Sequence, residues 1–141
     1  MNNVIELQAE RRRRRSANTY EAIRLQLEHI YKTQNLRCFT LGDTRGLTLS
    51  WAGNNSEAEI LSAYAPILAT CVDRDRRAQI FDRLRTFIPE ATEKSLEIRT
   101  FTVDGETLHL CVMSQSGVKH TDLYRAVSGV RRIFGQAEWA A

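Results

Sequence analysis

Residues 36–72 constrain the fold more than any other part of the chain, because their periodicity changes twice within a short span. Residues 36–41 and 47–51 alternate apolar and polar side chains, as half-buried strands do. The segment between them holds Gly42 and Gly46, whose backbone freedom suits a tight turn. A β-hairpin is predicted here, with alternate side chains of the second strand on one face: Leu47, Leu49 and Trp51.

The spacing becomes helical immediately after this hairpin, over residues 56–72. Ser56 and Glu59 form a capping-box pattern at its start. Pro66 lies inside the segment, where it should either kink the helix or mark a restart. Helical spacing continues over residues 73–88 after a charged stretch. The order strand, turn, strand, helix is typical of an interaction domain rather than an enzyme.

A helix is predicted on each side of this central part. Residues 16–34 carry apolar side chains at three- and four-residue spacing, with Ser16 or Asn18 as the N-cap. Residues 121–134 repeat that pattern, and Gly135 is placed to end the helix.

A second hairpin is predicted from residues 95–103 and 106–114, joined by the favoured two-residue turn Asp104-Gly105. The order is helix, hairpin, helix, hairpin, helix. We therefore expect an α+β fold in two layers, with one central antiparallel sheet and helices packed on it.

The chain has 141 residues, which is the usual size of one domain. Its formal net charge of +3 comes from one run, because without the five arginines of residues 11–15 the balance is 3 − 5 = −2. We divide the chain into a basic arm or helix extension (1–16), a folded domain (17–135) and a short tail (136–141). The run is Arg11, Arg12, Arg13, Arg14 and Arg15, and it either contacts a polyanion or only solubilises the chain.

Catalytic and metal-binding motifs are missing from the sequence. There is no GxSxG, GxGxxG or GxxxxGK[ST] pattern, and the histidines and cysteines lack metal-ligand spacing. We therefore expect no catalytic, cofactor or metal site, and ordinary surface or helix-end roles for the histidines. A reduced cytoplasmic protein without a membrane span fits the three separated cysteines and the short apolar runs. The three histidines are His29, His109 and His120, and the three cysteines are Cys38, Cys71 and Cys111.

The helix at residues 56–72 is apolar on more than one side. It is either a deep core helix or a helix whose second side meets a partner, and we favour a dimer interface because a domain of this size has few elements to cover both sides.

The chain resembles the roadblock/LC7 family, small domains that associate with Ras-like GTPases. The resemblance rests on LGDTRGLTLSWAG, EAEILSAYAPILA and the closing HTDLYRAVSGVRRIF, and it spans residues 16–134. Two features depart from the family pattern: only two strands follow the central helix instead of three, and residues 73–94 are longer and more charged. The arginine run is also foreign to the family.

The resemblance implies a non-catalytic homodimer or heterodimer without a cofactor, joined into a continuous sheet, that scaffolds or regulates a small GTPase. Some bacterial relatives stimulate GTP hydrolysis by their partner. The alternative function is a regulator that binds nucleic acid or an anionic surface through the arginine arm. By position, the resemblance assigns the dimer or partner interface to Ile60, Leu61, Tyr64, Ile67 and Leu68, with Leu96, Ile98 and Thr100 at the strand edge.

Overall fold

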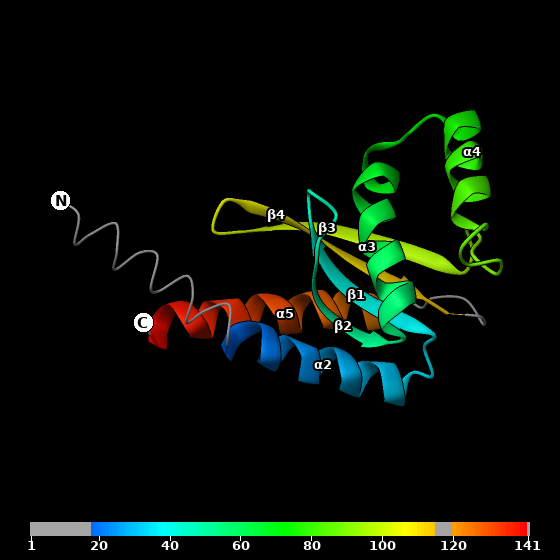
Figure 1. The fold of residues 1–141 in the computed structure, drawn as a ribbon. Coiled ribbons are helices and arrows are strands. Elements are labelled where there is room, and N and C mark those ends of the chain that lie inside the picture. Colours follow the sequence, from blue (N-terminus) through cyan, green and yellow to red (C-terminus); the bar gives the residue numbers. More distant parts are fainter. Residues whose placement is uncertain (1–17, 115–119, 141) are drawn as a thin grey trace.

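The structure is a computed structural model that describes residues 18–114 and 120–140. Four antiparallel strands form one sheet in the order β2-β1-β4-β3, as Figure 1 shows. The elements are α2 (Tyr20–Thr33), β1 (Cys38–Asp43), β2 (Thr48–Gly53), α3 (Asn55–Thr70), α4 (Arg74–Leu84), β3 (Leu96–Val103), β4 (Glu106–Met113) and α5 (His120–Ala140).

Helices cover both faces of the sheet. Successive side chains of a strand point to opposite faces, so each strand contributes to two separate cores. Phe39 and Leu110 pack with α2 and α5 on one face, whereas Cys38 and Cys111 pack with α3 and α4 on the other (Figure 1). The predicted α+β class with a central antiparallel sheet is confirmed, but the helices on both faces make three layers instead of the expected two.

The second hairpin has the predicted turn. Asp104 and Gly105 have φ angles of 54° and 78°, the left-handed backbone that a tight two-residue hairpin turn requires. Two strands therefore follow the central helix in the described part of the chain.

The first hairpin contains a register shift that its sequence pattern does not reveal. The Asp43 carboxylate accepts hydrogen bonds from the N–H groups of Arg45 (2.9 Å) and Leu47 (3.0 Å), which closes the turn. Pairing shifts between Leu41 and Gly42. Because of this irregularity, Leu49 packs on the α2–α5 side and Trp51 on the α3–α4 side, so the single face predicted for these residues is wrong.

The N-cap of helix α3 lies earlier in the chain than its capping-box pattern indicates. Asn54 is the N-cap instead of Ser56, and its side chain accepts a hydrogen bond from the Glu57 N–H at 3.1 Å. Pro66 does not interrupt the helix, which continues to Thr70. The inward residues Leu61, Ala65 and Leu68 hold both sides of the proline against the core, so packing offsets the lost helical hydrogen bond.

The predicted caps of the two terminal helices have different outcomes. For α2, the candidate Ser16 lies outside the described residues, and Asn18 is itself in a helical turn before Thr19, which precedes α2 without a side-chain cap bond. Helix α5 passes through Gly135 and reaches Ala140, so residues 136–140 are helical instead of forming a tail. Gly135 lacks the positive φ of a helix-ending glycine, and good helix formers follow it in the sequence.

Candidate interaction surface

Strand β3 lies at the edge of the sheet, with β4 on its inner side. Its predicted interface residues share the face that α3 covers. Leu96 is buried, Ile98 is half-buried and Thr100 is exposed. The Thr100 hydroxyl lies 2.9 Å from Nδ1 of His109 on β4. Among the described residues no strand pairs with the outer edge of β3, so its outward backbone groups can accept a further strand.

The residues predicted on α3 fall into two groups. Leu61 and Leu68 are buried in the core of their own protomer, so they cannot serve as surface contacts. Ile60 and Tyr64 are half-buried at the flanks, and Ile67 points outward with 48% of its surface exposed. The part of the predicted set that another molecule can reach on α3 is therefore Ile60, Tyr64 and Ile67.

The corner between α3 and α4 depends on Arg77. Its guanidinium donates two hydrogen bonds to the Glu93 carboxylate, at 2.8 and 3.1 Å, and further bonds to the carbonyl oxygens of Leu68 (2.6 Å) and Cys71 (3.2 Å). It also lies 5.8 Å above the Phe81 ring centroid. The hydrogen bonds to Glu93 raise the pKa of Arg77 above its ordinary value. One side chain thus caps the end of α3 and fixes α4 beside it.

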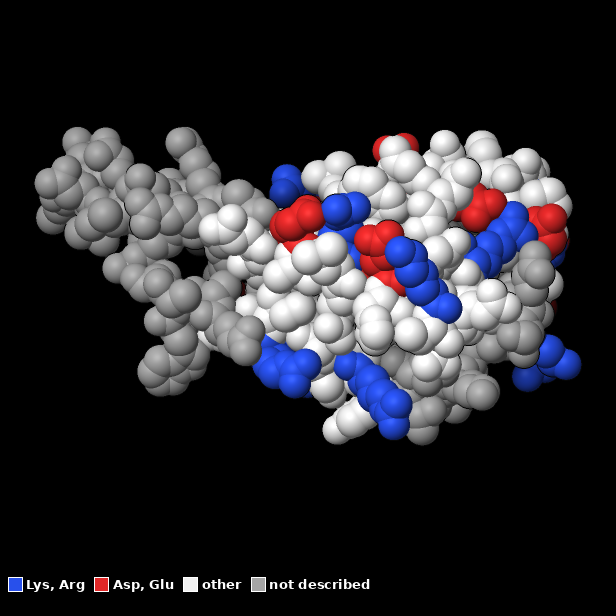
Figure 2. All heavy atoms as spheres, turned by 90° about the horizontal axis from the view of Figure 1, so that it is seen from below, with Lys and Arg blue, Asp and Glu red and all other residues white. Residues whose placement is uncertain are grey.

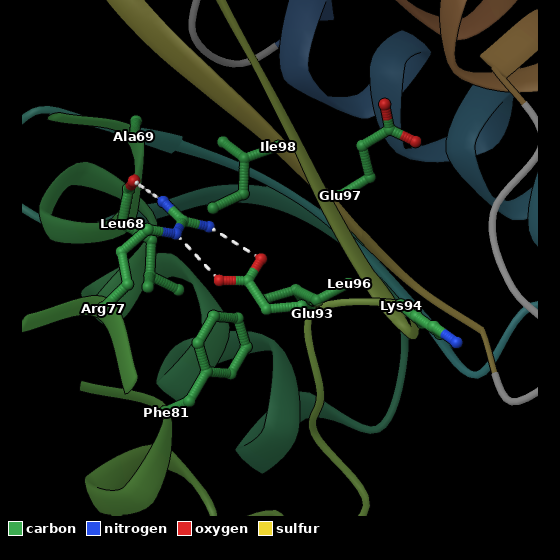
Figure 3. Close-up of a pocket in the computed structure, with 9 residues that line it drawn as sticks. All are labelled: Leu68, Ala69, Arg77, Phe81, Glu93, Lys94, Leu96, Glu97 and Ile98. Carbon is green, nitrogen blue, oxygen red and sulfur yellow. Dashed lines mark hydrogen bonds and ion pairs between the residues drawn. The ribbon is translucent and has the colours of Figure 1, made fainter. Parts of the chain in front are cut away.

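A shallow hollow lies beside this corner, between the end of α3, α4 and the start of β3 (Figure 3). Leu68, Leu96 and Ile98 provide apolar lining, and the Arg77–Glu93 pair lies across it. The lining is mixed, because the charged Lys94 and Glu97 also border it, and the described hydrogen bonds of the Arg77 guanidinium are to Glu93 and to backbone carbonyl oxygens. The sequence gives no signal for this corner, because its partners are 6 to 16 residues apart.

A second arginine joins the other end of α3 to the sheet. Arg37 donates to the Glu57 carboxylate at 2.7 and 3.2 Å and pairs with Glu90 at 3.0 Å. The Glu57 hydrogen bond is the main cause that raises the pKa of Arg37. The N-terminal turn of α3, the start of β1 and the loop before β3 are therefore held together.

Polar groups lie buried beneath α3. The hydroxyls of Thr40 and Ser62 are 2.5 Å apart, and His109 is buried instead of lying on the surface as we predicted. Burial lowers the pKa of His109 below 6.5, and the Asp43 carboxylate opposes this shift. Burial also raises the pKa of Cys38 to about 12, which makes its thiol unreactive at neutral pH.

The described residues contain no group of three or more His, Cys, Asp or Glu side chains that could hold a metal ion. Residues 11–15 lie outside the described part, so the structure does not test their predicted polyanion contact. No helix in the described ranges is both long and apolar enough to span a bilayer.

Comparison with known proteins identifies the fold through structure alone. No family profile matches the chain, and no curated protein matches it in sequence. The structure of Myxococcus xanthus MglB is similar with a TM-score of 0.52 and 13% identity, over 84% of this chain and 91% of that one. A structure described as MglB with tetrameric arrangement has a TM-score of 0.52 and 15% identity, over 85% and 93%. The structure of the gliding protein MglB from Thermus thermophilus has a TM-score of 0.52 and 15% identity, over 84% of this chain and 93% of that one.

These matches extend over most of this chain and nearly all of each compared chain. At such low identity they establish the architecture only. The chain has the roadblock/LC7-like fold.

Proposed function

We propose that this protein is a non-catalytic, dimeric regulator or scaffold that acts with a Ras-like small GTPase through protein–protein contacts in the cytoplasm. The observation that carries the proposal is the edge strand β3 next to the outward apolar side of α3, on the roadblock/LC7-like fold of small domains that associate with such GTPases. Three free cysteines agree with a reducing compartment.

The dimer would form by antiparallel pairing of β3 with β3 of a second copy. A two-fold axis perpendicular to the sheet relates such strands, so the two sheets continue into one and both α3 helices lie on the same side. Ile67 and the flanking Ile60 and Tyr64 would then be covered by the partner, with Ile98 and Thr100 along the strand edge. This arrangement accounts for an exposed isoleucine beside an open strand edge.

Light scattering of the full chain tests the dimer. The wild type should have twice the mass of one chain. Ile67→Glu should weaken the dimer about 100-fold, because burying an unpaired carboxylate costs about 3 kcal/mol. Leu25→Glu is the matched control, since Leu25 is 57% exposed on α2, on the opposite face of the sheet. A wild type that stays monomeric at high concentration would contradict the proposed dimer.

A pull-down of a Ras-like GTPase from the same genome by the full chain tests the partner. We expect a complex that Ile67→Glu weakens, whether or not hydrolysis is accelerated. A variant with Arg11, Arg12, Arg13, Arg14 and Arg15 changed to Gln separates the two candidate functions. Retained GTPase binding supports the regulator, and loss of all partners from an intact dimer would instead support the arginine arm as the binding element.

A further inference from the structure

Between Asp122 and Glu138, whose side chains lie outside the described part, the outward side of α5 carries only basic charge. Residues 123–135 contain three arginines and no aspartate or glutamate. Arg125, Arg131 and Arg132 are exposed, together with Ser128 and with Tyr124, which has 72% of its surface exposed. We call these five residues the α5 basic face. The opposite side of the helix is buried through Leu123, Ala126, Val130 and Phe134.

Charge on the neighbouring helix is arranged differently. On α2, Arg24 pairs with Glu21 at 2.9 Å and Lys32 pairs with Glu28 at 3.5 Å. Within the described residues no carboxylate forms an ion pair with an arginine of the α5 basic face. Figure 2 shows this contrast among the described side chains: red and blue lie together along α2, and blue stands without red along the described part of α5, in the lower part of the view. An uncompensated row of arginines attracts an anionic partner.

One arginine of the row is also held in place. The Arg131 guanidinium lies 5.6 Å above the Phe101 ring centroid on β3, which keeps its stem against the sheet while the charge faces solvent. Gly129 lies directly against Gln26 of α2, because a Cβ added there would be 2.5 Å from the Gln26 Nε2. The two helices are therefore closely packed, and α5 presents only one side outward.

This geometry favours a flat anionic partner over a nucleic-acid groove. A helix that reads the major groove must protrude from its domain, whereas α5 lies flat on the sheet and α2. A bilayer presents phosphates in a plane, which suits exposed arginines along one side of a helix that lies flat. An exposed tyrosine beside them suits the headgroup region.

We propose that the α5 basic face docks the protein on bilayers that contain anionic lipids. The charge of each protomer is sufficient for weak binding, since an arginine near the surface contributes about a fivefold gain in affinity. If the dimer proposed above forms, its two-fold axis places both α5 basic faces on the same side of the continuous sheet, so the two rows bind one surface together.

Co-sedimentation of the full chain with vesicles tests the proposal. One set of vesicles is phosphatidylcholine alone, and the other contains phosphatidylglycerol. We expect sedimentation only with the second set, and weaker binding as NaCl rises from about 0.1 M to about 0.5 M. The triple variant Arg125→Gln, Arg131→Gln, Arg132→Gln should bind about 100-fold more weakly. Arg74→Gln, Arg76→Gln, Arg83→Gln is the matched control, because it removes three exposed arginines from α4 on the other face of the sheet.

Ser128→Glu provides a second variant that removes no packing. It places a negative charge among the arginines, and we expect it to weaken vesicle binding about fivefold. Ser56→Glu, at an exposed position of α3, should leave binding unchanged. Equal binding to neutral vesicles, or equal loss in the α4 control, would overturn the proposal. Binding that depends on residues 11–15 but not on the α5 variants would overturn it too. So would capture of a short DNA duplex, but no vesicles, that the α5 variants abolish, since this outcome identifies nucleic acid as the partner.

Discussion

At the scale of single residues, Arg77 holds α3, α4 and the loop before β3 at one point. Arg77→Ala removes four hydrogen bonds and leaves the carbonyl oxygens of Leu68 and Cys71 without this donor. We expect the free energy of unfolding to fall by about 2 kcal/mol in urea denaturation. Arg76→Ala, at the exposed neighbouring position, should change it by no more than about 0.5 kcal/mol. Equal effects of the two variants would show that the corner is not held by Arg77.

His109 should make stability depend on pH. Its folded-state pKa lies below the unfolded value near 6.5 because burial disfavours the charged ring. Below that pH the unfolded state therefore binds more protons than the folded state, so stability is lost as pH falls. Urea denaturation between pH 8 and about pH 5 should show a smaller loss in His109→Gln than in the wild type. His29→Gln, at an exposed position on α2, is the control and should follow the wild type. If the free energy of unfolding changes equally with pH in all three proteins, His109 does not have this role.

At the scale of secondary-structure elements, α5 gives the clearest test of a corrected boundary. A Cβ added at Gly135 meets no atom within 4 Å, and this glycine has no positive φ. Gly135→Ala should therefore raise the free energy of unfolding by about 1 kcal/mol, the usual difference between the two residues inside a helix. Gly105→Ala should lower it by about 1 kcal/mol, because Gly105 has a φ of 78°. If Gly135→Ala is destabilising instead, the helix ends there as the sequence pattern indicates.

The elements that the sequence predicts are those with local signals. Asp104-Gly105 specifies its turn through two adjacent residues, and the apolar spacing of α2 and α3 is visible within each helix. The register shift next to Gly42 has no such local signal, and this glycine lies close to α3, since a Cβ there would be 3.2 Å from the Ser62 Cβ. Ser56 has a good capping pattern, yet Asn54 caps α3 because β2 ends at Gly53 and the helix starts immediately afterwards. Strand register and the exact start of a helix therefore depend on how the elements pack and connect, which a local sequence pattern does not show.

At the scale of the whole molecule, local sequence patterns also fail to show which residues of the candidate interface are exposed. Apolar spacing indicates that α3 has two apolar sides, but it cannot say which side the sheet covers. The structure decides this by burying Leu61 and Leu68 and leaving Ile67 outside. The α4 corner and the burial of His109 depend on contacts between distant segments, and no local pattern reports them.

A dimer that stabilises the folded protomer should make thermal stability depend on protein concentration. The melting temperature of the wild type should rise by about 2 °C for each tenfold increase in concentration, because association binds only the folded state. Ile67→Glu should remove this dependence, whereas Leu25→Glu should keep it, since only the first residue lies on the α3 side beside the β3 edge. A wild-type melting temperature that is independent of concentration would contradict a dimer formed only by folded protomers.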